Sequence, residues 1–327
     1  MLKSNTLKII FLSISCARPS HWIKNLFMLP GFALALTIEN HITANMFLYL
    51  AIGLISTSLL SSANYSLNEL LDSNYDKQHP IKKKRPLAQN LISYKLIIFQ
   101  YFVLTIIGIG LATLLTPMFL LISIIFLFMG LIYNVPPIRA KEIVYVDVLV
   151  EAINNPIRLF LGWSSICTII APPASFIICY WFGGAFLMAM KRYSEFKLIN
   201  NKDTATKYRK SFGVYNLDSL LLSAFYYSLF SIFFLGIFII KYHIEFIIIF
   251  PFISFLFIWY AYLAISAEDK DEISTDNLYK KKMFLGYFGL IGFFTIILFF
   301  VEIPFLNYLI DHSVLLDIKV DWIDLYE

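Results

Sequence analysis

Nine apolar stretches recur along this 327-residue chain, each close to the length of about 20 residues that a membrane-spanning helix needs. Only 15% of the residues are charged, whereas soluble domains carry about 25%. The chain therefore has too few charges to cover a surface that faces water. The sequence predicts an all-α, polytopic membrane protein with nine transmembrane helices. The predicted spans are 23–38, 43–65, 95–114, 117–135, 146–166, 173–190, 218–240, 246–266 and 283–303.

The lysine and arginine residues predict how the chain is oriented in the membrane. Cytoplasmic segments close to the spans accumulate such residues. Nearly all of them precede span 1 or lie in the loops after spans 2, 4, 6 and 8, whereas only Lys241 and Lys319 fall on the opposite side. We therefore expect a cytoplasmic N-terminus, with the chemistry at the cytoplasmic helix ends. The expected organisation is one integral-membrane domain over 1–327, with an N-terminal cytoplasmic or interfacial segment (1–22) and a C-terminal tail (304–327).

An acidic motif ends the second predicted span. Asn68, Asp72 and Asp76 are spaced i, i+4 and i+8, which favours one face of a helix, and Glu69 lies beside them. Such oxygen ligands suit Mg²⁺, which usually takes one or two carboxylates and completes its shell with water and substrate phosphates. The basic run 82–85 follows and is suited to phosphate oxygens. The alternative is a polar helix end that enters water, with the basic run serving only to orient the span.

A second polar group interrupts the fifth predicted span. Asp147, Glu151, Asn154, Asn155 and Arg158 share one face of a helix. A charge facing lipid would cost at least about 2.5–3.5 kcal/mol, so this face should look into the bundle. We interpret it as the wall of a polar cavity, with Arg158 available to a phosphate. The alternative is structural pairing of Glu151 with Arg158, or of Asp147 with a lysine.

A third cluster closes the sixth predicted span. Lys191, Arg192 and Glu195 precede a basic loop that continues to Lys210. Cations near a helix C-terminus also favour its dipole, which is the structural alternative. That alternative explains neither Glu195 nor so long a basic loop.

Together these motifs resemble the UbiA superfamily of intramembrane prenyltransferases. The string Asn68-Glu69-x-x-Asp72-x-x-x-Asp76 is similar to that family's first motif, N-D-x-x-D-x-x-x-D, with Glu69 in place of Asp. The second D-x-x-x-D motif of typical aromatic prenyltransferases is not matched, and Lys191-Arg192-x-x-Glu195 stands there instead. In this respect the sequence resembles the branch of the superfamily that contains decaprenyl-phosphate phosphoribosyltransferase. Further similarity to that branch lies in 18–25, in Asp76-x-x-His79-Pro80-x-Lys82-x-x-Arg85-Pro86, and in Tyr133 ahead of Lys141 and Asp147.

The resemblance implies an activity and a set of site residues. The expected reaction is Mg²⁺-dependent transfer of a 5-phosphoribosyl group from phosphoribosyl diphosphate to polyprenyl phosphate. The implied setting is cell-envelope biosynthesis at the inner membrane of a prokaryote, with the active site facing the cytoplasm. The catalytic residues would be Asn68, Asp72 and Asp76, which with Glu69 would also bind the metal. The implied substrate-binding residues are Lys24, Lys83, Arg85, Tyr133, Lys141, Asp147, Arg158, Lys191, Arg192 and Glu195.

Two other functions remain open from the sequence. A prenyltransferase would use the same metal but move the polyprenyl group of a polyprenyl diphosphate to an aromatic or other small acceptor. An ion-coupled transporter would use the intramembrane charges as an ion path. It is the weakest of the three, because the paired broken half-helices of inverted-repeat transporters are not evident. No nucleic-acid partner is expected.

Overall fold

The computed structural model describes residues 2–39, 41–167, 170–266 and 281–306, and within these ranges every regular element is helical. The predicted all-α architecture is therefore confirmed. Most of the predicted C-terminal tail and the loop 267–280 lie outside the described residues. The α-helices are α1 (Leu2–Ala17), α2 (Leu29–Leu36), α3 (Ala44–Asp76), α4 (Tyr94–Ala112), α5 (Pro117–Asn134), α6 (Val146–Ala152), α7 (Asn154–Ser164), α8 (Ala174–Ile199), α9 (Lys202–Tyr208), α10 (Leu217–Tyr242), α11 (Phe250–Ile265) and α12 (Lys282–Leu298).

Five of these helices, α3, α4, α5, α8 and α10, are long and apolar enough to cross a membrane. Helices α11 and α12 are apolar but shorter, with 16 and 17 residues. The first predicted span begins as a 3-10 helix, η1 (Pro19–Met28), and only then becomes α2. The nine crossings and the orientation therefore remain predictions.

The fifth predicted span is broken between α6 and α7. Pro156 has no N–H, so it cannot donate to the carbonyl of Ala152 four residues earlier, and its ring crowds that carbonyl. Glu151 lies just before the break and Asn154 and Asn155 just after it, and all three line a cavity described below. The break therefore belongs to the part of the chain that forms the site.

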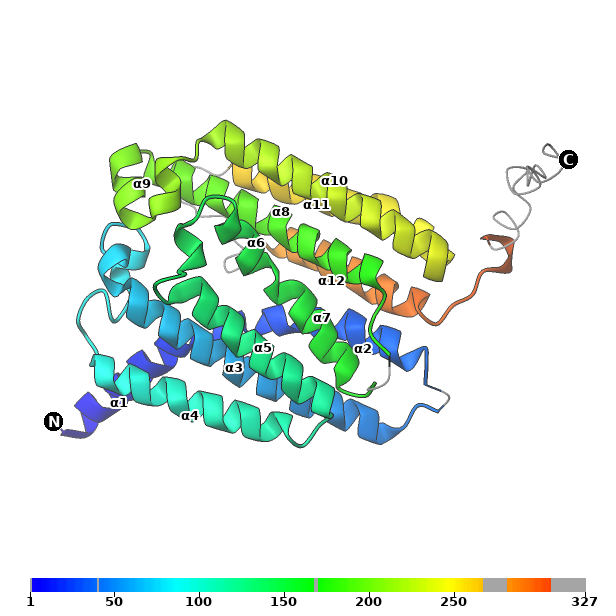
Figure 1. Cartoon of the computed structure of the whole chain (residues 1–327), viewed down its shortest axis with the longest axis horizontal. Coiled ribbons are helices and arrows are strands. Elements are labelled where there is room, and N and C mark those ends of the chain that lie inside the picture. Colours follow the sequence, from blue (N-terminus) through cyan, green and yellow to red (C-terminus); the bar gives the residue numbers. More distant parts are fainter. Residues whose placement is uncertain (1, 40, 168–169, 267–280, 307–327) are drawn as a thin grey trace, which may run out of the picture.

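The helices form two packed groups with the broken segments between them (Figure 1). On one side α3 packs along α4 and α5, and on the other α8 packs along α10 and α11. Helix α7 connects the groups because it contacts α2, α5 and α8. Helix α1 begins at one end of the bundle, and the described chain ends beyond α12 at the other (Figure 1).

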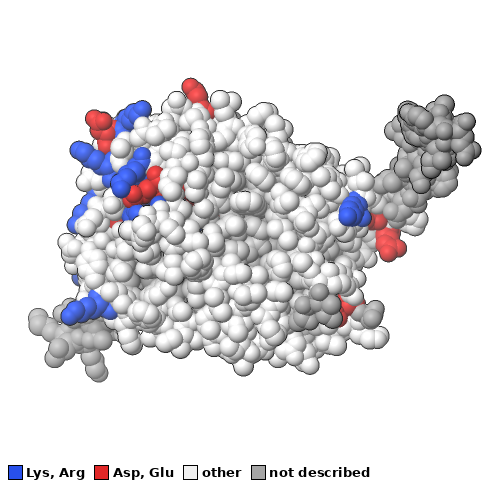
Figure 2. All heavy atoms as spheres, viewed as in Figure 1, with Lys and Arg blue, Asp and Glu red and all other residues white. Residues whose placement is uncertain are grey.

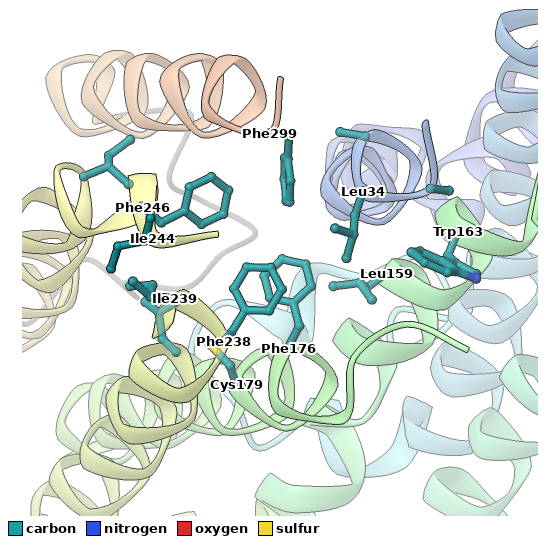
Figure 3. Packing of buried hydrophobic residues seen from close by; sticks show 14 of the residues in the cluster. Leu34, Leu159, Trp163, Phe176, Cys179, Phe238, Ile239, Ile244, Phe246 and Phe299 are labelled. Carbon is teal, nitrogen blue, oxygen red and sulfur yellow. The ribbon is translucent and has the colours of Figure 1, made fainter. Parts of the chain in front are cut away.

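The end of the bundle near Phe299 is held by an apolar cluster that joins α2, α7, α8, α10 and α12 (Figure 3). Phe176 of α8 stacks on Phe238 of α10 with a centroid separation of 4.4 Å. Leu34 and Leu159 approach from α2 and α7, and Phe299 closes the cluster. Burial of such side chains stabilises the fold by about 1.5–3 kcal/mol each. Apolar packing therefore holds the helices together at this end, and most of the lysine and arginine side chains lie at the opposite end (Figure 2).

Two glycines set how closely η1 and α2 approach α7. A Cβ on Gly31 would lie 1.9 Å from the carbonyl oxygen of Leu159, and one on Gly162 would lie 1.9 Å from the carbonyl oxygen of Met28. Both obstacles are backbone atoms, which cannot rotate away as a side chain can. The close contact between these broken segments therefore requires glycine at both positions.

We expect Gly162→Ala to destabilise the protein by at least about 1–3 kcal/mol, because overpacking here moves backbone. Thermal unfolding of the detergent-purified protein would show a lower midpoint. Gly236→Ala in α10 is the matched control, since nothing lies within 4 Å of its added Cβ. Equal midpoints for the two variants would contradict the proposed close packing.

Candidate active site

Charged side chains gather at one end of the face shown in Figure 2, and its central band is free of them. A cavity of about 160 Å³ lies at this end, between α3, α5, α7 and α8. A larger cavity of about 600 Å³ lies at the other end, near Lys241, His243 and Glu302. We assign the candidate site to the smaller cavity because it contains most of the residues singled out from the sequence.

The walls of this cavity are strongly cationic. Eight lysine and arginine side chains line it, against three carboxylates. The cations are Arg18, Lys24, Lys82, Arg85, Arg158, Lys191, Arg192 and Arg209, and the carboxylates are Asp72, Glu151 and Glu195. Such an excess in a partly enclosed space raises the local concentration of anions. Glu69, Asp76 and Asp147 pair with Arg18, Arg85 and Arg192 from behind this lining. The positive excess that remains suits an anionic ligand.

Asn68 and Asp72 of the acidic motif line the cavity. Arg139 donates to Oδ1 of Asp72 over 3.0 Å, and Lys141 donates to the same oxygen. Oδ2 of Asp72 accepts only from the Asn68 amide, over 3.1 Å. Oδ2 of Asp72 and the side-chain oxygen of Asn68 are therefore the candidate ligands here for a Mg²⁺ that takes its other ligands from water and phosphate.

Glu69 and Asp76 do not line the cavity, although Asp76 was expected on one face with Asn68 and Asp72, and Glu69 was implied as a further metal ligand. Glu69 is 1% exposed and pairs with Arg18 at 3.4 Å, and Asp76 is 1% exposed and pairs with Arg85 at 2.7 Å. The reason is helical geometry: at 3.6 residues per turn an i+8 residue has rotated about 80° from the first, and an adjacent residue about 100°. Both carboxylates therefore hold cationic segments in place.

Arg192 is the centre of the charge network on the opposite wall. It is 1% exposed and donates to Asp147 Oδ2 over 3.1 Å and to Glu195 Oε2 over 2.9 Å. It also donates to Glu151 and, over 2.8 Å, to the hydroxyl of Tyr133. The pairing of Glu151 with Arg158 considered from the sequence is absent among the described ion pairs, and Glu151 instead pairs with α8.

Arg158 differs from the other cations of the cavity. Its guanidinium donates to Asn25 Oδ1 over 2.9 Å and to the carbonyl of Asn154 over 3.1 Å, and it lies 5.1 Å from the Phe126 ring centroid. Within the described ranges no carboxylate forms an ion pair with it. A buried cation without a counter-ion is costly, so Arg158 is the strongest candidate for an anion-binding residue.

The loops after α3 and α8 meet at the mouth of the cavity. Lys82 donates to Glu195 and, over 2.7 Å, to the hydroxyl of Tyr208 on α9. Burial opposes the charge of Arg85, but Asp76, Tyr208 and Glu69 together outweigh this effect and raise the pKa of Arg85 above its ordinary value. Burial lowers the pKa of His79 to about 3, so its neutral imidazole accepts from the backbone N–H groups of residues 81 and 82.

Other predicted substrate-binding residues lie at different depths. Lys24, Arg85, Tyr133, Arg158, Lys191, Arg192 and Glu195 line the cavity, whereas Lys83, Lys141 and Asp147 do not. Lys83 is exposed because the 3-10 turn η2 (Lys82–Lys84) directs its neighbour Lys82 inward. Lys141 and Asp147 are buried behind the lining, where burial lowers the pKa of Lys141 to about 8 although Asp72 favours the ammonium form.

The sequence interpretation did not single out several residues of the site. The described structure adds Asn134, Arg139, Tyr208 and Arg209. It also places Arg18, Asn25 and Lys82 at the site, which the sequence analysis named only within longer strings. Most of them come from loops or helix ends, where the sequence has no periodic pattern that predicts which way a side chain points. The one available signal was the density of cations in the segments around them.

Comparisons with known proteins agree with this geometry. The sequence profile of the UbiA prenyltransferase family matches residues 25–287. A decaprenyl-phosphate phosphoribosyltransferase of Mycobacterium tuberculosis strain H37Rv is 28% identical over 204 residues, which are 62% of this chain and 65% of that protein. The protein of the same name from Corynebacterium glutamicum is 26% identical over 62% of this chain and 59% of its own length. The match thus spans less than two thirds of these relatives.

Solved structures share the fold. A UbiA homologue from Archaeoglobus fulgidus bound to DMAPP and Mg²⁺ has a TM-score of 0.67 at 18% identity, covering 88% of this chain and 97% of that one. The apo UbiA homologue from Aeropyrum pernix K1 has a TM-score of 0.62 at 16% identity, covering 81% and 97%. At such identities the likeness concerns the fold alone. The family match covers most of the sequence and confirms the resemblance carried by the acidic motif, and this chain belongs to the UbiA prenyltransferase family.

Proposed function

We propose that this protein transfers a 5-phosphoribosyl group from phosphoribosyl diphosphate to a polyprenyl phosphate and releases diphosphate. The observation that carries the proposal is the cavity lining, with eight cations against three carboxylates. Both substrates of this reaction carry phosphate, and one carries a diphosphate and a 5-phosphate together. A prenyl diphosphate with an uncharged acceptor would need fewer cations. The names of the matched relatives favour the same reaction.

The cationic groups divide between the two ends of the cavity. Lys82, Arg85 and Arg209 at the mouth suit the soluble phosphoribosyl diphosphate, which would enter from water. Arg158 with Lys24 suits the phosphate of the lipid, whose tail would lie among the apolar helices. The lipid phosphate oxygen attacks the anomeric carbon of the ribose while the bond from that carbon to diphosphate breaks. The nucleophile is already an anion, so no strong protein base is needed.

Mg²⁺ would be held by Asp72 and Asn68 and would stabilise the charge of the departing diphosphate. Arg139 and Lys141 fix the orientation of the Asp72 carboxylate from behind. Glu69 and Asp76 support the site indirectly by holding Arg18 and Arg85 at the wall. We also propose that this end of the bundle faces the cytoplasm, because the predicted loops there carry most of the lysine and arginine residues.

A direct assay tests the proposed reaction. We expect purified protein with Mg²⁺, radiolabelled phosphoribosyl diphosphate and polyprenyl phosphate to yield a labelled lipid, and EDTA to abolish its formation. The prenyltransferase alternative retains support from the fold relative bound to DMAPP and Mg²⁺. Activity only on polyprenyl diphosphate with an aromatic acceptor would establish that alternative. Membership in a transferase family makes the ion-coupled transporter the least favoured of the three.

A further inference from the structure

Two groups of side chains with oxygen atoms suited to a metal lie at the cavity, and by composition each is a candidate for a divalent cation. The first is the pair Asn68 and Asp72 on α3. The second joins Asp147 and Glu151 of α6 with Glu195 of α8, and it contains more carboxylates than the first. The two groups differ because the guanidinium of Arg192 already lies among the carboxylate oxygens of the second group.

We propose that the guanidinium of Arg192 takes the place of a divalent cation in the second group, so that the protein binds one metal ion and not two. Arg192 donates to a carboxylate oxygen of each of the three acids, and to the Tyr133 hydroxyl. Four of its five N–H groups therefore have protein acceptors. This inference deepens the proposed function and rests on the single Mg²⁺ assigned there.

The three carboxylates have further donors that leave little capacity for a metal. Asp147 accepts from the hydroxyl of Tyr215 over 2.8 Å, and Glu151 from that of Tyr133 over 2.6 Å. Glu195 accepts from Lys82 and, over 3.3 Å, from the hydroxyl of Tyr208. Mg²⁺ needs its oxygen ligands at about 2.0–2.1 Å. Within the described residues no group of three or more His, Cys, Asp or Glu side chains is arranged to hold a metal ion.

The charges of the second group lead to the same conclusion. Its three carboxylates face Arg192 and also receive Lys82, Lys191 and Arg209, which lie within 4 Å of Glu195, Glu151 and Asp147 respectively. A divalent ion added here would be repelled by these cations. At Asp72, by contrast, both cationic partners use Oδ1 and leave Oδ2 with only an amide. A guanidinium fixed at this place is a positioning group, since it holds two helices of the cavity wall together without exchanging with solvent.

Counting bound metal tests this proposal without relying on turnover. Purified protein in detergent is dialysed to equilibrium against Mn²⁺ with inorganic diphosphate on both sides, and bound manganese is measured by elemental analysis. We expect saturation at one Mn²⁺ per chain. Arg192→Ala opens the three carboxylates and is expected to raise the count to two, whereas Arg192→Lys keeps it at one. Arg209→Ala is the matched control, because it removes a cation from the same cavity but leaves Arg192 in place, and its expected count is one.

The outcomes separate this inference from the proposed function. A wild-type count of two overturns the inference, as does a count of one for a folded Arg192→Ala variant. A wild-type count of two overturns the inference even when Arg192→Ala does not fold. A count of one without labelled lipid in the transferase assay refutes the proposed function and leaves the inference standing, whereas a count of zero overturns both.

Discussion

Asp72→Asn is expected to reduce the rate of phosphoribosyl transfer by about 10²–10³-fold. Removing one group that stabilises charge in a transition state commonly costs this much. The substitution keeps the size of the side chain but removes the carboxylate that faces the cavity and would hold Mg²⁺ against the diphosphate. The measurement is the initial rate of lipid labelling at saturating Mg²⁺.

A second readout separates loss of the metal site from loss of the fold. Mg²⁺ with inorganic diphosphate should raise the unfolding temperature of the wild type, because ligand binding stabilises the folded state. The shift should be absent in Asp72→Asn. Asp203→Asn is the matched control, since Asp203 is exposed on α9 and outside the cavity lining. A rate for Asp72→Asn within threefold of the control would refute the assignment of Asp72.

Arg158→Gln is expected to lower kcat/KM for polyprenyl phosphate by about 10- to 100-fold without lowering stability. A hydrogen bond to a charged group contributes about 1.5–3 kcal/mol, which corresponds to this range. Arg158 is 6% exposed, and no carboxylate among the described residues pairs with it. Removing it should relieve repulsion among the cations of the cavity, so the unfolding temperature should stay the same or rise.

The substrate dependence gives this prediction its sharpest test. The effect should fall mainly on KM for the lipid phosphate and much less on KM for phosphoribosyl diphosphate. Lys207→Gln removes an exposed cation from α9, outside the cavity lining, and serves as the control. An equal effect on both substrates, or a lower unfolding temperature for Arg158→Gln than for the control, would contradict the assignment of Arg158 to the lipid phosphate.

Helix α3 shows how far local spacing could predict the site. The i, i+4 relation brought Asn68 and Asp72 to the cavity as expected, because four residues advance a helix by little more than one turn. The same argument was wrong for Asp76, because a small angular error per turn accumulates over two turns. Glu69 was implied as a metal ligand by the family resemblance and not by this spacing, and as the neighbour of Asn68 it lies outside the cavity lining. Helical periodicity therefore predicted which side chains face the cavity for residues one turn apart, but not for residues two turns apart.

The sequence could not predict which residue each charged side chain pairs with. Glu151 and Arg158 lie seven residues apart on one predicted face, yet Glu151 accepts from Arg192 of α8 and Arg158 donates to Asn25 of η1. Pro156 breaks the helix between them, and the neighbouring helices offer closer partners. Lys82 and Tyr208 are 126 positions apart in sequence and meet at the mouth of the cavity. Such contacts depend on how the helices pack, which a linear pattern does not contain.

The sequence by itself determined that this chain is a helical membrane protein of the UbiA type, with most of its charged residues in the segments at one end. It did so because the length of an apolar segment and its scarcity of charge can be read from that segment alone. In addition, charged residues spaced along one face of an apolar helix must face the protein interior and not lipid. Only the tertiary structure decided which charges face the cavity and which are already neutralised. The close approach of α7 to η1 and α2 at Gly31 and Gly162, together with the packing of α6 against α8, brings Arg192 among three carboxylates and leaves Arg158 without one. Electrostatic pairing acts over a few ångströms in space, so it is set by the packed helices and not by the order of residues along the chain.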